Sequence, residues 1–416
     1  MQSSVTDMVQ SELLMIFIIF AFGLFMMQVA KKIQVPDIAL FIIIGILIGP
    51  PGLHLISQPS NSVAYQFIIY LGSILILFDG GRAIDMSVLK KVWRTLSLLS
   101  ILGVLIMVVV VGLVAHWVVG IPIVYALLLA AVISPTDPAT LIPVFKQVKI
   151  RDKVRQTVES ESAFNDATGS ILTITLLGII LSQAKVSIGA GVGEFVLQAG
   201  GGLLLGAIVG YIGLLLKSQH RLGFFHEYSH IVGAMMAIGA YLAAESIGAS
   251  GFMATFTAGI ISGNPQLFNL ELHRRSNRNL FEFGETTTLI MRTLIFMLLG
   301  TQVQFSSLSH FWWQGLIIVL VFMFVARPLA VMACTFPDRK AKWEWKEILF
   351  MFWVRETGVI PAALSGMILV SGVKYGNLIF SVTFMAILIT ILIQASTTGI
   401  VAKKLGLIVK PSSSQE

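Results

Sequence analysis

Long apolar stretches constrain the fold of this chain more than any other feature. Hydrophobic residues make up 56% and charged residues 12% of the 416 positions, whereas about a quarter of the residues in a soluble domain are charged. About thirteen stretches are long enough to cross about 30 Å of hydrocarbon. They lie at 13–30, 35–56, 63–80, 95–118, 121–145, 161–182, 193–216, 228–247, 249–264, 284–303, 311–335, 347–370 and 376–400. The sequence therefore predicts an all-α polytopic membrane protein.

The basic residues indicate how the chain crosses the membrane. If the N-terminus lies outside, most of the 28 Lys and Arg residues fall on inner connections, and only Lys185 and Lys374 fall on outer ones. Cytoplasmic loops of membrane proteins carry such an excess of Lys and Arg. We therefore expect an N-terminus outside and a cytoplasmic C-terminus. The net charge of +7 follows from this topology, so we do not expect nucleic-acid binding.

Residues for other kinds of chemistry are scarce. Cys334 is the one cysteine, which excludes an internal disulfide and a multi-thiolate metal site. No His or Cys pair has the spacing of a transition-metal site, and no Gly-rich loop is placed to bind phosphate. We expect neither an enzyme nor a cofactor. The tail at 404–416 is too short for a regulatory domain, so we expect such control to come from a separate regulatory subunit.

Acidic residues inside the apolar stretches mark the candidate site. Asp137 lies between prolines in "SPTDP", and Asp166 ends the run "ESAFND" at the start of the next stretch. Charged residues within membrane spans are functional-site hypotheses by default, because they are costly to bury. Four-residue spacing places Glu161 with Asn165, and Ser162 with Asp166, on shared helix faces. These side chains are suited to line a wet cavity.

Further charged residues occur in other spans. Asp79 lies in "LFDGG", Arg327 in "FVARPLAV" and Arg355 in "WVRETGVIP". The acids of the fifth and sixth spans and these two arginines could meet inside a helix bundle. An ordinary interfacial position is the alternative for Asp79, which is near the inner end of its span. We expect Arg292 to reach the interface through its long side chain.

Two spans carry signals of a broken helix. Pro135 and Pro138 interrupt backbone hydrogen bonding in the fifth span, and Gly358 and Pro361 do so in the twelfth. If spans 1–6 and 8–13 form two inverted six-helix repeats, the interrupted helices occupy the same place in each repeat and cross near the midplane. Interrupted segments at matching positions are the best sequence indication of a transporter binding site.

The chain resembles the sodium/proton exchanger superfamily, and specifically the NhaP-like branch of monovalent cation:proton antiporters. The resemblance rests on "SPTDP" at 134–138, "ESAFND" at 161–166, "LFDGG" and Arg327, and it extends over essentially the whole chain. It implies a carrier that exchanges Na⁺ or K⁺ for H⁺, with no transition metal. It also implies a homodimer in contact with membrane lipid, in the inner or plasma membrane of a prokaryote.

The resemblance implies a role for each acidic residue. Asp166 would bind either cation or proton, and Asn165 would orient the site beside Asp137. Glu161 would form a permanent buried ion pair with Arg327. Because Asn165 cannot titrate, Asp166 would be the one carboxylate whose charge varies, which predicts electroneutral one-for-one exchange. If Asp137 also titrated, two protons could move per cation, and transport would be electrogenic.

The resemblance further implies that three groups help Asp166 to hold the cation: the backbone of Thr136 and the side chains of Ser162 and Asp79. Two positions depart from the family pattern. Relatives often have Glu where this chain has the shorter Asp79. Relatives also often have a Gly-Gly-x-Arg-Gly run in the twelfth span, where this chain has "FWVRETG". Arg355 and Glu356 are therefore further candidate residues.

Alternating access would move one part of the single transmembrane domain against the other. We expect a core bundle at approximately 95–182 and 311–400, and a dimerisation scaffold at approximately 13–80 and 193–303. Several alternative functions fit the same residues. They are a K⁺/H⁺ antiporter of the potassium-efflux branch, a cation channel without proton exchange, and a proton-coupled symporter or anion carrier. The sequence does not choose among Na⁺, K⁺, Li⁺ and NH₄⁺.

Overall fold

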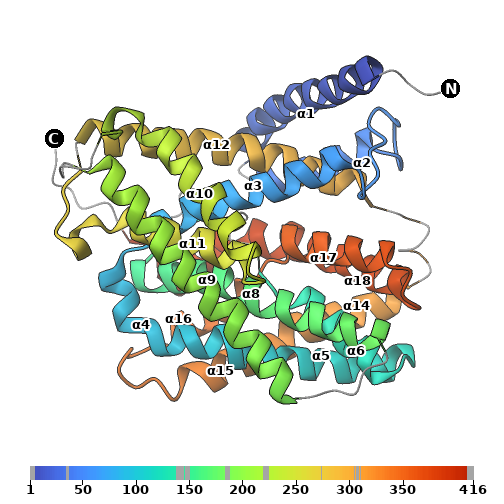
Figure 1. The fold of residues 1–416 in the computed structure, drawn as a ribbon. Coiled ribbons are helices and arrows are strands. Elements are labelled where there is room, and N and C mark those ends of the chain that lie inside the picture. The colour runs from blue at the N-terminus through green and yellow to red at the C-terminus, as the bar shows by residue number, and fades with distance from the viewer. Residues whose placement is uncertain are drawn as a thin grey trace.

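The computed structural model describes residues 5–33, 37–136, 145, 150–182, 188–218, 224–272, 274–303, 305, 309 and 311–409. Over these residues the regular structure is helical (Figure 1), with two isolated antiparallel β-bridges, Ile150 with Ile408 and Ser218 with Leu272. Eight described helices are long and apolar enough to cross a membrane, and four shorter apolar helices accompany them. The prediction of an all-α polytopic membrane protein is confirmed. The count of thirteen spans and the inverted repeats stay predictions.

The helices have the following bounds. In chain order they are α1 (Val5–Ile33), α2 (Asp37–Ile48), α3 (Val63–Arg82), α4 (Met86–Leu98), α5 (Val104–Val119), α6 (Ile123–Ile133), α8 (Asp152–Ser182), α9 (Ile188–Lys217), α10 (Ser229–Glu245), α11 (Gly251–Gly263), α12 (Arg274–Thr301), α14 (Trp312–Val321), α15 (Arg327–Thr335), α16 (Trp345–Trp353), α17 (Val359–Val370), α18 (Gly376–Ile389) and α19 (Ser396–Leu405). Three π-helical turns join consecutive helices: η1 (Leu99–Gly103), η4 (Phe322–Ala326) and η5 (Thr390–Ala395). Two 3₁₀ turns, η2 (His226–Tyr228) and η3 (Pro265–Phe268), lie in connections.

Several helices extend past the apolar stretches that predicted them. The fourth stretch begins at 95, whereas α4 begins at Met86, and the sixth begins at 161, whereas α8 begins at Asp152. Polar sequence starts both helices. The Asp85 side chain caps α4 by accepting a hydrogen bond of 2.7 Å from the Ser87 backbone N–H, and Asp152 places a negative charge in the first turn of α8. Both features favour a helix start.

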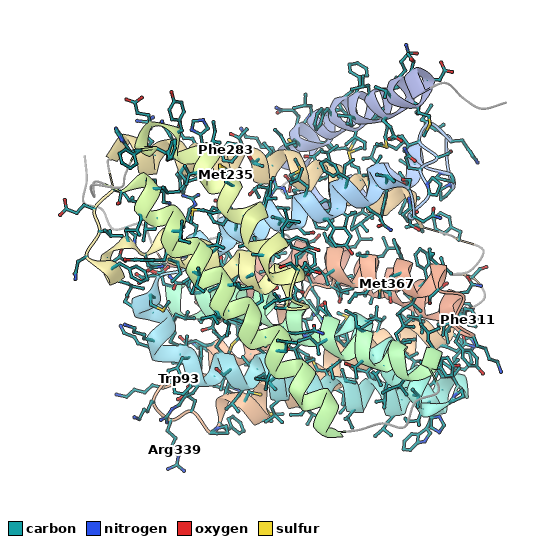
Figure 2. The ribbon with its side chains drawn as sticks, in the orientation of Figure 1. Trp93, Met235, Phe283, Phe311, Arg339 and Met367 are labelled. Carbon is teal, nitrogen blue, oxygen red and sulfur yellow. The ribbon has the colours of Figure 1, made fainter. Side chains whose placement is uncertain are left out.

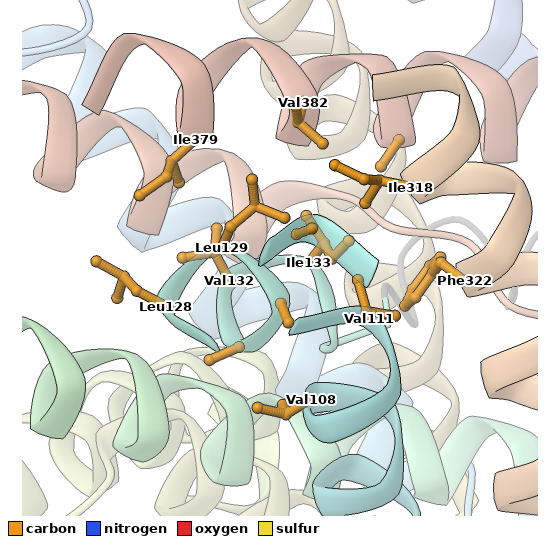
Figure 3. Packing of buried hydrophobic residues seen from close by; sticks show 14 of the residues in the cluster. Val108, Val111, Leu128, Leu129, Val132, Ile133, Ile318, Phe322, Ile379 and Val382 are labelled. Carbon is orange, nitrogen blue, oxygen red and sulfur yellow. The ribbon is translucent and has the colours of Figure 1, made fainter. Parts of the chain in front are cut away.

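A first apolar cluster packs α6 between α5, α14 and α18. Figure 3 shows Val111, Ile133, Ile318, Phe322 and Val382 meeting between these helices. Each of these side chains is at most 1% exposed. In a bilayer such packing stabilises helix association through van der Waals contact, because lipid is as apolar as the side chains. The helix that leads into "SPTDP" is therefore held on several sides.

A second apolar cluster joins α1, α2, α3 and α12, and Val359 of α17 and Phe384 of α18 also pack into it. Beside it, α11 crosses α3 at close range. A Cβ atom at Gly259 would collide with the backbone carbonyl of Phe78. Small residues permit this kind of close crossing between membrane helices. In Figure 1, α3, α10 and α12 lie on one side of the molecule and α5, α6 and α14 on the other.

Both predicted interruptions coincide with helix ends. Helix α6 ends at Ile133, and Pro135 and Thr136 are not helical. Helix α16 ends at Trp353, the segment 354–358 is not helical, and α17 begins at Val359. The structure therefore interrupts the twelfth span at Gly358, as predicted, and Pro361 lies in the first turn of α17. In the fifth span, the described residues show the end of the first half-helix.

Aromatic and basic side chains occur near the ends of the predicted spans. Figure 2 shows Trp93 and Arg339 at one side of the molecule and Phe311 at the opposite side. Trp93 is 56% exposed, and Trp117, near the outer end of its span in the predicted topology, is 77% exposed. Exposed tryptophans at span ends are typical of the membrane interfaces. The orientation of the termini stays a prediction.

Candidate functional site

The centre of the candidate site is a hydrogen-bonded group between α8 and the non-helical residues after α6. The Thr136 backbone N–H donates to Asn165 Oδ1 at 3.0 Å, and Asn165 Nδ2 donates to Thr136 Oγ1 at 2.9 Å. The Thr136 hydroxyl donates to Ser162 Oγ at 2.8 Å. All three residues are at most 3% exposed. Asn165 thus fixes Thr136 by two bonds and satisfies a buried backbone N–H that lies outside the helix.

A glycine allows this close approach. Gly169 lies one turn beyond Asn165 on α8, and a Cβ atom built on it would be 2.7 Å from Pro135 Cδ. Real Cβ contacts are essentially never that short. A side chain at 169 would therefore push the non-helical segment away from α8 and lengthen the hydrogen bonds of Thr136.

Asp166 follows Asn165 on α8 and is 1% exposed. It shares a helix face with Ser162, four residues earlier. The carboxylate of Asp166 and the hydroxyls of Ser162 and Thr136 are hard oxygen donors, which suit monovalent alkali cations better than soft ligands would. Asp137, the other acid predicted at this site, lies outside the described residues.

Glu161 and Arg327 form a buried ion pair across α8 and α15. Arg327 Nη1 donates to Glu161 Oε1, and Arg327 Nη2 donates to Glu161 Oε2 at 2.9 Å. Arg327 Nε also donates to the Met351 carbonyl of α16 at 2.9 Å. Both charged side chains are 1% exposed. The guanidinium thus joins α8, α15 and the end of the first half of the twelfth span.

Local sequence explains why Arg327 lies where it does. Pro328 has no N–H to donate, and its ring would clash with the backbone carbonyl four residues earlier. A regular helix is therefore disturbed at this point. The π-helical turn η4, Phe322–Ala326, directly precedes Arg327. Such turns are commonly inserted into helices at functional sites. The widened turn precedes the arginine that pairs with α8.

Arg355 connects the two interrupted spans. Its Nη2 atom donates to the backbone carbonyl of Ser134, the C-cap residue of α6, and its guanidinium lies 4.5 Å from the centroid of the Phe322 ring. The C-terminal end of a helix carries partial negative charge, which a cation stabilises. Arg355 therefore neutralises the end of α6 and also interacts electrostatically with Asp166.

Glu356, the next residue, is 0% exposed. Its Oε1 atom accepts a hydrogen bond of 3.4 Å from the Thr398 hydroxyl of α19. The neighbouring backbone is held by the π-helical turn η5, because the Thr357 N–H donates to Thr390 Oγ1 at 3.1 Å. Glu356 is thus a buried acid beside Arg355, within the break between α16 and α17.

Asp79 forms its polar contacts within α3 and with α12, away from the group around Thr136. It forms an ion pair with Arg82 of the same helix, and its Oδ2 atom accepts a hydrogen bond of 3.4 Å from Thr288 of α12. At 7% exposed it is more buried than an ordinary interfacial residue. The hydrogen bonds found among the described residues tie Asp79 to α3 and α12, not to Thr136 or Ser162. Arg292 pairs with Asp37 at 2.8 Å and is 8% exposed; our expectation of an interfacial side chain was wrong.

The structure also adds residues that the sequence did not single out. They are Ser134, whose carbonyl accepts from Arg355, and Thr390, Gln394 and Thr398, which bond the break in the twelfth span. A signal for the last three exists, because the run "TILIQASTT" at 390–398 places many polar side chains in an apolar span. The Ser134 contact has no such signal.

The fold and this site define a class of protein. A helical membrane protein with buried oxygen ligands next to an interrupted helix, joined by an arginine to a second interrupted helix, has the features of an ion-coupled secondary transporter. The family described as sodium/hydrogen exchanger, transmembrane, matches residues 16–404. The chain belongs to the sodium/hydrogen exchanger family, a family of transporters and not of enzymes.

Individual relatives agree with this assignment. A probable Na⁺/H⁺ antiporter 2 of Methanocaldococcus jannaschii is 30% identical over 408 residues, which cover 91% of this chain and 93% of the relative. A K⁺/H⁺ antiporter, NhaP, of Alkalimonas amylolytica is 29% identical over 409 residues, covering 96% and 68%. The solved structure of the sodium proton antiporter MjNhaP1 of Methanocaldococcus jannaschii at pH 8 matches with a TM-score of 0.79 and 27% identity, covering 95% of this chain and 99% of that one.

Proposed function

We propose that this protein exchanges Na⁺ or K⁺ for H⁺ by competition at Asp166. The observation that carries the proposal is a carboxylate only 1% exposed, one position after the Asn165 that bonds Thr136. Relatives named Na⁺/H⁺ and K⁺/H⁺ antiporters support the exchange. Ser162, Thr136 and Asp79 are the further cation ligands in this proposal, although Asp79 would first have to loosen its bonds to Arg82 and Thr288.

We propose one-for-one, electroneutral exchange from the charges of the core. Two hydrogen bonds join the Arg327 guanidinium to the two carboxylate oxygens of Glu161, so the charges of the pair cancel. Asn165 is fixed to Thr136 and carries no charge. One variable carboxylate, Asp166, then crosses the membrane neutralised either by a proton or by one cation. Asp137 is assigned a constant charge in this count.

Transport would proceed by movement of a core bundle against a scaffold. We assign the core to approximately 95–182 and 311–400 and the scaffold to approximately 13–80 and 193–303. Because Arg327 and Arg355 bond α15 and the 354–358 break to α8 and α6, these elements would move together. We further propose a homodimer in a prokaryotic plasma membrane, with lipid contacts, an N-terminus outside, a cytoplasmic C-terminus and control by a separate regulatory subunit.

Asp166→Asn tests the assignment directly. The variant keeps the shape of the side chain but cannot bind a proton in exchange for a cation, so cation-driven pH change in sealed vesicles should vanish. Gel filtration and thermal unfolding should match the wild type. Retained exchange at the wild-type rate would refute the role of Asp166. A channel would instead pass cations without moving protons, so the same vesicles separate the two classes of protein.

The choice between Na⁺ and K⁺ is a second question for the same assay. A relative named for Na⁺ and one named for K⁺ are almost equally identical to this chain, at 30% and 29%, so similarity does not decide it. Proton flux driven by each cation in turn, over a range of concentrations, gives the two KM values. The lower KM identifies the preferred substrate.

A further inference from the structure

One more buried acid follows Arg355 but has no part in the exchange described above. Glu356 is in the non-helical segment at 354–358 and is 0% exposed. An ionisable side chain at membrane depth is costly to keep and is a functional-site hypothesis by default. The nearest charge in sequence is Arg355, which is 1% exposed.

Polar side chains of the last span form hydrogen bonds with this segment and with the residue before it. Thr398 Oγ1 donates to Glu356 Oε1 at 3.4 Å, Gln394 Nε2 donates to the Trp353 carbonyl at 2.6 Å, and Thr390 Oγ1 accepts from the Thr357 N–H at 3.1 Å. Thr390 and Gln394 belong to the π-helical turn η5, and Thr398 follows it in α19. The last span therefore holds both the broken backbone and the acid in place.

Arg355 donates to the Ser134 carbonyl, two residues before the Thr136 that bonds Asn165 and Ser162, so its charge lies beside the site of Asp166. The charged groups around Arg355 are Arg327, Glu161, Glu356 and Asp166. Glu161 and Arg327 cancel within their bidentate pair. The remaining positive charge, that of Arg355, would act on Asp166 as a fixed internal cation and would weaken binding of a transported one. An ionised Glu356 beside Arg355 offsets that positive charge.

We propose that Glu356 is a positioning residue for cation binding, because its charge balances Arg355 and leaves the charge of Asp166 to be neutralised by the transported cation or proton. This inference rests on the proposed exchange at Asp166. At an effective dielectric constant of about 20, removing one negative charge about 12 Å away changes the binding of a cation by about tenfold, and a closer charge changes it more.

The test uses Glu356→Gln in the full chain, reconstituted in vesicles with Na⁺ and with K⁺ in separate runs. We expect the KM for the cation to rise about tenfold, by more than the maximal rate changes. The pH of half-maximal exchange should move down, because proton binding at Asp166 weakens too. Glu356→Asp should restore most of both values. A KM and pH profile identical to the wild type would overturn the proposal.

A matched control is Glu344→Gln. Glu344 is at the start of α16, in the same span, but its side chain is 53% exposed and pairs with Arg151 at 2.7 Å. Loss of its charge should leave the cation KM unchanged. An equal rise of KM in both variants would mean that general charge, and not the position of Glu356, sets the affinity, which overturns the proposal.

Two further variants keep the test decisive. If Glu356→Gln does not fold, Thr398→Val removes the hydroxyl that stabilises the ionised carboxylate. Its KM should exceed the wild-type KM by a ratio that grows as the pH falls, and equal KM values at every pH would overturn the proposal. Asp166→Asn is measured in parallel. Exchange by that variant refutes the proposed function itself, whereas its loss together with an unchanged Glu356→Gln refutes the role of Glu356 alone.

Discussion

At the scale of single residues, the site depends on the absence of a side chain at Gly169. The Thr136 hydrogen bonds to Asn165, at 3.0 and 2.9 Å, require the segment after α6 to lie against α8. Pro135 is the residue that a Cβ atom at position 169 would meet at the shortest distance. Displacement of catalytic or ligand groups by about 1 Å can cost a hundredfold in rate. We therefore expect transport to be sensitive to the geometry of this contact.

Gly169→Ala should lower the exchange rate about tenfold or more, because its Cβ atom would displace Pro135 and with it Thr136. The matched control is Gly178→Ala on the same helix, where a new Cβ atom meets nothing within 4 Å. We expect the control to exchange normally. Proton flux in vesicles measures both variants, and equal activity of the two would contradict the importance of the contact.

The Glu161–Arg327 pair makes a second prediction at this scale. Glu161→Gln leaves the Arg327 guanidinium buried without its carboxylate, and loss of one partner of a buried ion pair destabilises a protein by about 3–5 kcal/mol. Replacing both residues, as Glu161→Gln with Arg327→Met, should destabilise less than Glu161→Gln alone. Thermal unfolding in detergent compares the variants. A double variant less stable than the single one would show that the pair is not the cause.

Residues of one helix could be predicted to lie together, and residues of different spans could not. Glu161, Ser162, Asn165 and Asp166 share one and a half turns, so helical spacing alone groups them. The contact of Arg355 with Ser134 joins positions 221 apart in sequence. It depends on how two interrupted spans approach each other, which no local pattern encodes. The bonds of Asp79 to Thr288, 209 residues away, were unpredictable for the same reason.

At the scale of secondary-structure elements, apolar runs located the spans but not the ends of the helices. A hydropathy pattern reports the part of a helix that lies in hydrocarbon, and polar turns at either end continue the helix without an apolar signal. The start of α4 illustrates this, since Asp85 caps the helix well before the predicted stretch. The interruptions at Pro135 and Gly358 were predictable, because proline and glycine act on the backbone directly.

The cap of α4 makes a prediction that includes pH. The hydrogen bonds from Ser87 lower the pKa of Asp85 below its usual range. The ionised carboxylate therefore adds stability above the unfolded pKa of about 3.9, and this stability is lost as the pH falls through the lower pKa of the folded state. Asp85→Ala should cost about 1 kcal/mol at neutral pH. Asp85→Asn should keep the cap.

Unfolding temperatures of the wild type and of Asp85→Asn, measured from pH 7 down to acid pH, test the sign. The stabilisation of the wild type relative to the Asn variant should shrink as the pH falls below about 4. A difference that grew towards acid pH would contradict the assignment of Asp85 as an ionised cap.

Two of the three π-helical turns occur at comparable places in the two halves of the chain, and η5 has no such counterpart in α8. Turn η1 interrupts the span that contains α4 and α5, and η4 interrupts the span that contains α14 and α15. These are the fourth and eleventh spans of the predicted order, the fourth place of each six-helix repeat. This correspondence supports the inverted repeats. Of the two turns, only η4 has an obvious sequence signal, which is Pro328.

At the scale of the whole molecule, we expect two groups of helices to move relative to each other during transport. The interrupted spans, with α8 and α15, are joined by buried ionic and hydrogen-bonded contacts through Arg327 and Arg355. The helices α2, α3 and α12 meet them mainly through apolar side chains such as Val359 and Phe384. A contact that lacks directional bonds can slide at lower cost than one made of buried charges, which favours movement at this boundary.

The charge count makes a prediction for the whole transporter. With one variable carboxylate, exchange should carry no net charge, so the rate in vesicles should not respond to a clamped membrane potential. Moving one elementary charge would couple to the potential by about 2.3 kcal/mol per 100 mV, which is a large effect on rate. Flux that changes with potential would contradict the count and would bring Asp137 into it.

The central claim is that cation and proton compete for the carboxylate of Asp166. Calorimetric titration of the purified protein with Na⁺ and with K⁺, at a series of pH values, tests it most directly. We predict that the Kd of the preferred cation rises about tenfold for each unit of pH below the range in which the site takes up its proton, and that Asp166→Asn binds neither cation measurably. A Kd that stays constant across the series, or unchanged binding by Asp166→Asn, would contradict the account.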